Sequence, residues 1–171
     1  FEDNIDLGEL AEAPHLDIDI YQNKPEALAV LKNALGDKFD ELQLQFETDI
    51  QRTIRVIQFE DAEIEISLDI GEVRTETSKQ EIHEVEFELK SGSIQSLLAF
   101  SFEWVKKYHL WLDVRSKAEF GHLLTVGQKV SPAQLSKETI LNKKDTADKN
   151  LRVLIASQLQ HLLPNIAAIS A

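Results

Sequence analysis

Residues 84–92 read EVEFELKSG, in which three glutamates alternate strictly with three apolar residues. A β-strand sends successive side chains to opposite faces of its sheet, so the alternation predicts a strand with Glu84, Glu86 and Glu88 on one face. Three carboxylates at that spacing repel one another unless a cation lies among them. The pattern fits two interpretations equally well: a solvated acidic face, or hard oxygen ligands for a divalent cation such as Mg²⁺ or Mn²⁺.

The composition disfavours several classes of protein. None of the 171 residues is cysteine, so neither a disulfide nor a thiolate metal site can form. The net charge of −12 disfavours non-specific binding to nucleic acid. No apolar run has the length of a transmembrane helix and no leader peptide is visible, so we expect a cytoplasmic protein without nucleic-acid or membrane partners. Because the chain contains no methionine and opens at Phe1, we expect it to be a fragment of a longer protein.

Periodicity in the first half of the chain predicts one helix and then strands. Apolar residues at helical spacing predict a helix over 24–35, with Pro25 in its first turn and Gly36 at its end. Before it, residues 1–22 carry no regular pattern. Alternating residues then predict a hairpin that turns at Glu60 and Asp61 and a polar loop before the glutamate strand; the two hairpin strands and the loop span residues 41–59, 62–69 and 75–80.

The second half is predicted to be mainly helical. Ser93 is placed to cap a helix over 94–108, and Ser116 is placed to cap a turn of helix that carries Lys117. A short strand is predicted between them over 110–114. The remaining residues read as a polar linker over 126–150 and an apolar helix over 151–169 that is interrupted at Pro164.

Four segments, taken together, keep a distinctive order and spacing; they are FETDIQRTIRV (46–56), EIEISLDIGEV (63–73), IHEVEFELKSG (82–92) and RSKAEFGHLL (115–124). This arrangement resembles the C-terminal half of the CYTH domain, the triphosphate tunnel metalloenzyme family. That family includes class IV adenylyl cyclases, thiamine triphosphatases and bacterial inorganic triphosphatases. The chain most resembles the bacterial CYTH–CHAD proteins, in which a linker and a helical phosphate-binding domain follow the tunnel.

The resemblance implies a fold of the α+β class. The family's eight-stranded antiparallel β-barrel surrounds a charged tunnel, and residues 1–125 would form its C-terminal half with flanking helices. Residues 126–150 would be the linker, and residues 151–171 would be the first helix of a CHAD-like domain.

The resemblance also implies roles for individual residues. Arg52 matches a phosphate-binding arginine, and Lys117 matches the lysine of the family's closing Ser-Lys motif, so both are expected to bind substrate. Lys117 and Glu65 are the expected catalytic residues. Mg²⁺ or Mn²⁺ is expected to bind at four carboxylates, namely Asp69, Glu84, Glu86 and Glu88.

The expected function is metal-dependent hydrolysis of inorganic triphosphate. Hydrolysis of thiamine triphosphate, cyclisation of ATP, and non-catalytic binding of polyphosphate or metal remain alternatives. The family's opening Glu-x-Glu-x-Lys strand and its Arg-x-Arg strand have no counterpart here, and Phe120 and His122 stand where Arg and Tyr are usual. We therefore expect the 171-residue chain alone to be inactive and to self-associate through open sheet edges.

Overall fold

The computed structural model describes residues 5–9, 18–36, 38 and 41–170, and it divides into two compact units, residues 1–44 and 45–171. In the first unit a 3₁₀ turn, η1 (Ile18–Tyr21), precedes helix α1 (Pro25–Leu35). Pro25 occupies the first turn of α1, and Gly36 ends the helix with a φ of 57°, which favours glycine. The predicted helix is confirmed. Most of the segment expected to be irregular over 1–22 lies outside the described residues.

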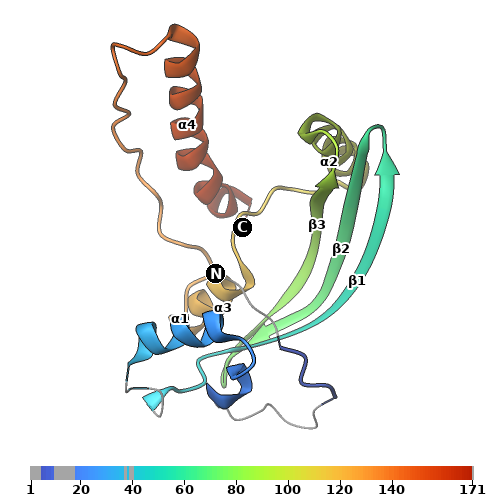
Figure 1. Ribbon diagram of the computed structural model, residues 1–171, viewed down its shortest axis with the longest axis vertical. Coiled ribbons are helices and arrows are strands. Elements are labelled where there is room, and N and C mark those ends of the chain that lie inside the picture. Colours follow the sequence, from blue (N-terminus) through green and yellow to red (C-terminus); the bar gives the residue numbers. More distant parts are fainter. Residues whose placement is uncertain (1–4, 10–17, 37, 39–40, 171) are drawn as a thin grey trace. The chain divides into compact units, whose positions relative to one another are not determined.

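The second unit contains a three-stranded antiparallel sheet in the order β1 (Glu47–Phe59), β2 (Ala62–Arg74) and β3 (Lys79–Ser91). The three long strands bend together, as Figure 1 shows. The turn at Glu60 and Asp61 is confirmed, because Phe59 pairs directly with Ala62. The predicted end of the second strand at residue 69 is wrong. The strand continues to residue 74, because Val73 is fully buried in a core cluster and its burial favours continued strand pairing.

Two helices cover opposite faces of this sheet. On the face that carries Ile64, helix α2 (Ile94–Tyr108) packs Phe100 against the strands. On the other face, helix α3 (Lys117–Thr125) packs Phe120 against Val73 and Ile82. Because Val73 and Ile82 are in phase with the acidic residues of β2 and β3, α3 lies on the acidic face of the sheet.

Both predicted helix caps are confirmed. The Ser93 hydroxyl accepts a hydrogen bond from the backbone N–H of Ser96, and the Ser116 hydroxyl accepts one from that of Glu119, each at 3.2 Å. The predicted strand over 110–114 is wrong. This segment forms no ladder with any described strand, and side-chain bonds between Asp113 and Arg115 hold it instead.

The α+β class is confirmed, but a closed barrel is not shown. Among the described residues the sheet has three strands, and the outer edges of β1 and β3 pair with no further strand. The expected half-barrel is therefore seen as an open, bent, antiparallel sheet.

The C-terminal region consists of an irregular segment and one long helix. Residues 128–146 contain neither helix nor strand, and helix α4 (Ala147–Ser170) follows. The predicted interruption at Pro164 is wrong, because α4 continues through it. The helix also starts earlier than expected, since the Thr146 hydroxyl accepts a hydrogen bond from the Lys149 N–H at 3.3 Å, as an N-cap does. Within the described part of the chain, no helix combines the length and apolarity needed to cross a lipid bilayer.

Candidate active site

The candidate site begins with a row of three paired residues across the sheet. Arg52 of β1 lies opposite Asp69 of β2, and Asp69 lies opposite Glu84 of β3. Glu86, two residues further along β3, shares their face and lies opposite Ser67. Strand register alone therefore gathers one cation and three carboxylates on the face that α3 covers.

Arg52 and Asp69 form a bidentate pair. Arg52 Nε donates to Asp69 Oδ1 at 2.7 Å, and Nη2 donates to Oδ2 at 2.6 Å. The same Nη2 also donates to Glu86 Oε2 at 2.9 Å, which links β1 to β3 over the central strand. The Asp69 side chain is 0% exposed, whereas that of Arg52 is 42% exposed. The pair thus has a buried acidic end and a basic end that reaches solvent.

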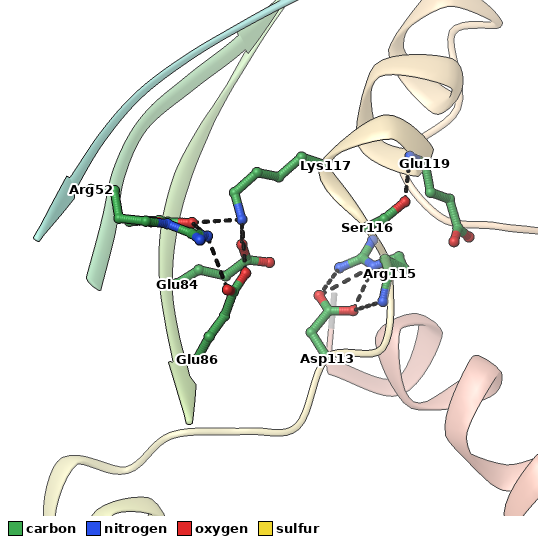
Figure 2. Close-up of polar contacts among 9 residues, drawn as sticks. Arg52, Glu84, Glu86, Asp113, Arg115, Ser116, Lys117 and Glu119 are labelled. Carbon is green, nitrogen blue, oxygen red and sulfur yellow. Dashed lines mark hydrogen bonds and ion pairs between the residues drawn. The ribbon is translucent and has the colours of Figure 1, made fainter. Parts of the chain in front are cut away.

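Lys117 enters the site from the first residue of α3. Its Nζ lies 2.7 Å from Asp69 Oδ2 and 3.1 Å from Glu86 Oε1, and it also donates to Glu84 Oε2. Figure 2 shows the side chain extending from α3 toward Glu84 and Glu86. The ammonium group has three donors, and the three carboxylates accept from all of them. The sequence-predicted residues Arg52, Asp69, Glu84, Glu86 and Lys117 are thereby brought together.

These contacts shift the protonation equilibria of Asp69, Arg52 and Lys117. The hydrogen bonds from Arg52, together with the hydrogen bond and charge of Lys117, lower the pKa of Asp69 from 3.8 to about 2, against the opposing effect of burial. The hydrogen bond to Asp69 raises the pKa of Arg52 above its ordinary value. Burial by itself would lower the pKa of Lys117, but the hydrogen bonds to Asp69 and the two glutamates outweigh it and raise the pKa. All three groups are therefore charged at neutral pH.

The segment before α3 is fixed by Arg115. Its guanidinium forms a bidentate pair with Asp113 and lies 4.3 Å from the centre of the Phe120 ring. The Arg115 side chain is mostly buried, and Figure 2 shows its pair with Asp113 beside the start of α3. The pair therefore positions the helix that carries Lys117. Sequence reasoning missed Arg115, although it stands two residues before Lys117 in the segment RSK.

A second ionic cluster lies further along the same face. Glu65 of β2 is opposite Glu88 of β3, and Lys90 bridges them, with its Nζ 3.1 Å from Glu65 Oε2 and 3.2 Å from Glu88 Oε1. The register shifts here, so that Glu63 pairs with Ser91 and Lys90 is the unpaired extra residue of a bulge. Sequence reasoning also missed the role of Lys90, although this residue continues the two-residue spacing of the preceding glutamates.

Among the described residues, one set of ligands suited to a metal lies on the charged face. Asp69, Glu84 and Glu86 each offer a carboxylate oxygen, and these oxygens lie within 4.8 Å of one another. Hard carboxylate oxygens are the ligands that Mg²⁺ and Mn²⁺ prefer, so the donor set fits the expected cation. Glu88, also expected to bind metal, lies outside this set and contacts Lys90 instead. Glu65, expected to be catalytic, contacts Lys90 too.

Comparison with known proteins finds a related triphosphatase. The chain is 37% identical over 83 residues to an inorganic triphosphatase of Haemophilus influenzae. The matched stretch is 48% of this chain and 24% of that protein, so the chain spans about a quarter of its relative's length. No protein-family model matches the chain. The match supports a relationship to triphosphatases of the kind that the sequence motifs resemble.

Proposed function

We propose that the protein hydrolyses inorganic triphosphate, using a divalent cation held by Asp69, Glu84 and Glu86. The observation that carries this proposal is the convergence of those three carboxylates with Arg52 and Lys117 on one face of the sheet. The relative from Haemophilus influenzae, whose name is inorganic triphosphatase, supports the same substrate. Mg²⁺ or Mn²⁺ bound there would neutralise phosphate charge and help to orient the attacking water.

The two basic side chains supply what a triphosphate needs from the protein. Triphosphate carries about four negative charges at neutral pH, and its hydrolysis is accelerated mainly by charge neutralisation and positioning. Arg52 uses Nε and Nη2 on Asp69 and Glu86, while its Nη1 has no partner among the described residues. Two N–H donors of a fixed, half-exposed guanidinium thus remain for phosphate oxygens. Lys117 contributes a second cation from the opposite side of the site.

Asp69 holds Arg52 in place before any substrate arrives. Its side chain is fully buried and accepts two hydrogen bonds from Arg52, so the orientation of this guanidinium does not depend on the substrate. Such preorganised charge is more effective than charge that must be recruited during the reaction. Glu65 is bound to Lys90 at 3.1 Å, and its expected role as a catalytic base stays a prediction.

The proposal is tested by colorimetric phosphate release from the protein expressed from its complete gene. Inorganic triphosphate, thiamine triphosphate and ATP are offered separately, each with Mg²⁺ and with EDTA. We expect Mg²⁺-dependent release that is fastest with inorganic triphosphate. Faster release from thiamine triphosphate would identify that compound as the substrate. If none of the three compounds is hydrolysed but polyphosphate binds tightly, the protein is a polyphosphate-binding module and not an enzyme.

A further inference from the structure

The ammonium group of Lys117 occupies the centre of the candidate metal site. The residues whose oxygens could hold a cation are Asp69, Glu84 and Glu86, and Lys117 Nζ contacts one oxygen of each of these three. Figure 2 shows the side chain reaching from α3 to this point, between the helix and β3. The lysine therefore uses the same ligands that a divalent cation would use.

A divalent cation and this ammonium would occupy the same place between the three carboxylates. Mg²⁺ binds carboxylate oxygens at about 2.0–2.1 Å, closer than any hydrogen bond from an ammonium group. Two cations within about 4 Å of each other also repel, most strongly near the fully buried Asp69. The metal and the ammonium are therefore expected to compete for these carboxylates.

The geometry allows Lys117 to be the one that leaves. Its side chain is a flexible four-carbon stem with 21% of its surface exposed, so the ammonium can move toward solvent without moving α3. Asp69 would keep its orientation, because the bidentate pair with Arg52 does not depend on Lys117. The helix itself stays anchored through Phe120 in the core cluster with Val73.

We propose that Lys117 and a divalent cation exclude each other at Asp69, Glu84 and Glu86, so that binding of the metal releases the lysine ammonium onto the open face of the site. The proposal rests on the proposed function, because it uses the same metal set. It adds that the lysine becomes free for the anionic substrate only when the metal has taken its place. Metal and triphosphate would then bind cooperatively.

The first test compares metal affinity in Lys117→Met with that in Lys90→Met. Each substitution removes one positive charge from the same face, but Lys90 contacts Glu65 and Glu88 and none of the three proposed ligands. The pair therefore separates local competition from the general effect of charge. Mn²⁺ binding is measured by electron paramagnetic resonance and Mg²⁺ binding by calorimetry, on the protein expressed from its complete gene, with circular dichroism to confirm folding.

The expected result is binding that is roughly tenfold or more tighter in Lys117→Met, since the metal no longer has to displace three charge-assisted hydrogen bonds. The Lys90→Met variant should change by less than about threefold. Equal effects of the two substitutions, or weaker binding in Lys117→Met, would overturn the proposal.

The second test needs no substitution. Reductive methylation of the native protein with ¹³C-formaldehyde labels accessible lysines, and peptide mass spectrometry gives the extent at Lys117 and at Lys90. Saturating Mg²⁺ should increase labelling of Lys117 several-fold while leaving Lys90 unchanged. Labelling of Lys117 that does not rise with Mg²⁺ would contradict the release of its ammonium.

The two proposals fail in distinguishable ways. If the native protein hydrolyses triphosphate with Mg²⁺ but Lys117→Met does not bind metal more tightly, the exclusion proposal is wrong and the proposed function stands. If neither the native protein nor Lys117→Met binds a divalent cation, both are wrong.

Discussion

Arg52 and Asp69 lie directly opposite each other on neighbouring strands and are joined by two hydrogen bonds of 2.7 and 2.6 Å. The aspartate is fully buried, and it also holds Lys117 at 2.7 Å. Both basic groups of the candidate site therefore contact the same buried carboxylate. Neutralising the charge of Asp69 should therefore affect both basic groups.

Acid should weaken the fold through Asp69. Its pKa is about 2 in the folded protein and 3.8 ordinarily, so its stabilising effect is complete above about pH 5 and is lost as pH falls through the range from 4 to 2. The shift corresponds to roughly 2–3 kcal/mol in the free energy of unfolding. Urea unfolding of the wild type and Asp69→Asn should differ by about that amount at pH 7 and converge toward pH 2. A difference that stays constant with pH would contradict the assignment.

Replacing either basic residue should impair turnover. Because each makes charge-assisted contacts, Arg52→Ala and Lys117→Ala should lower kcat/KM for triphosphate by about ten- to a hundredfold, equivalent to 1.5–3 kcal/mol. Steady-state kinetics and the melting temperature are measured on the same preparations. A purely structural ion-pair network predicts the reverse pattern, with a lower melting temperature and unchanged kinetics per folded molecule.

Glu88 should matter less than Glu86. The sequence motif predicts the same metal-binding role for Glu86 and Glu88. In the structure, however, Glu86 contacts both basic residues of the site, whereas Glu88 contacts Lys90. Glu86→Gln should raise the Mg²⁺ concentration needed for half-maximal activity by about tenfold or more, since a charged ligand is lost. Glu88→Gln should shift it only slightly. Equal shifts in a Mg²⁺ titration would restore Glu88 to the metal set.

Gly121 should tolerate no side chain. A Cβ atom at this position of α3 would lie 2.2 Å from Cδ2 of the Phe46 ring, which packs against the core cluster. Gly121→Ala should therefore destabilise the fold by about 1–3 kcal/mol, even though alanine favours helices. Denaturant midpoints measure the change. Adding Phe46→Leu should recover part of the loss if the ring is its cause, and strictly additive effects would refute that cause.

The 171-residue chain, studied alone, should self-associate. Within the described residues β1 and β3 have unpaired outer edges, and Ile54 and Val56 of β1 are more than half exposed. Open apolar edges promote pairing between chains, and lysine on an edge strand opposes it. Light scattering should reveal oligomers that diminish when Ile54 and Val56 are replaced by lysine. A monodisperse monomer at high concentration would contradict this expectation.

Local signals in the sequence predicted the elements that carry the site. The period of two around Glu86 and the serine caps at residues 93 and 116 act over a few residues, so they indicated β3, α2 and α3 correctly. The pairing of Arg52 with Asp69 could also have been predicted from the sequence. A two-residue turn at 60–61 sets the register of the hairpin, and that register puts the two residues opposite each other.

The remaining features depend on contacts between distant segments. Lys117 reaches Glu84 and Glu86 because Phe120 anchors α3 on Val73, a packing that neither segment indicates alone. Phe120 first appeared as a departure from a family pattern, and its burial gives it a structural role. The prediction of a strand over 110–114 was wrong for a related reason, because strand propensity alone does not supply a neighbouring strand to pair with.

The most direct test of the account is Mg²⁺-dependent phosphate release from inorganic triphosphate by Glu86→Gln and Glu81→Gln, made in the protein expressed from its complete gene. Both substitutions remove one negative charge from β3, but Glu81 lies on the opposite face of the sheet from Glu86. The account predicts that Glu86→Gln loses at least about 90% of the activity while remaining folded. It predicts that Glu81→Gln stays close to wild type. Equal activity in the two variants at low Mg²⁺ would contradict the assignment of this face as the active site.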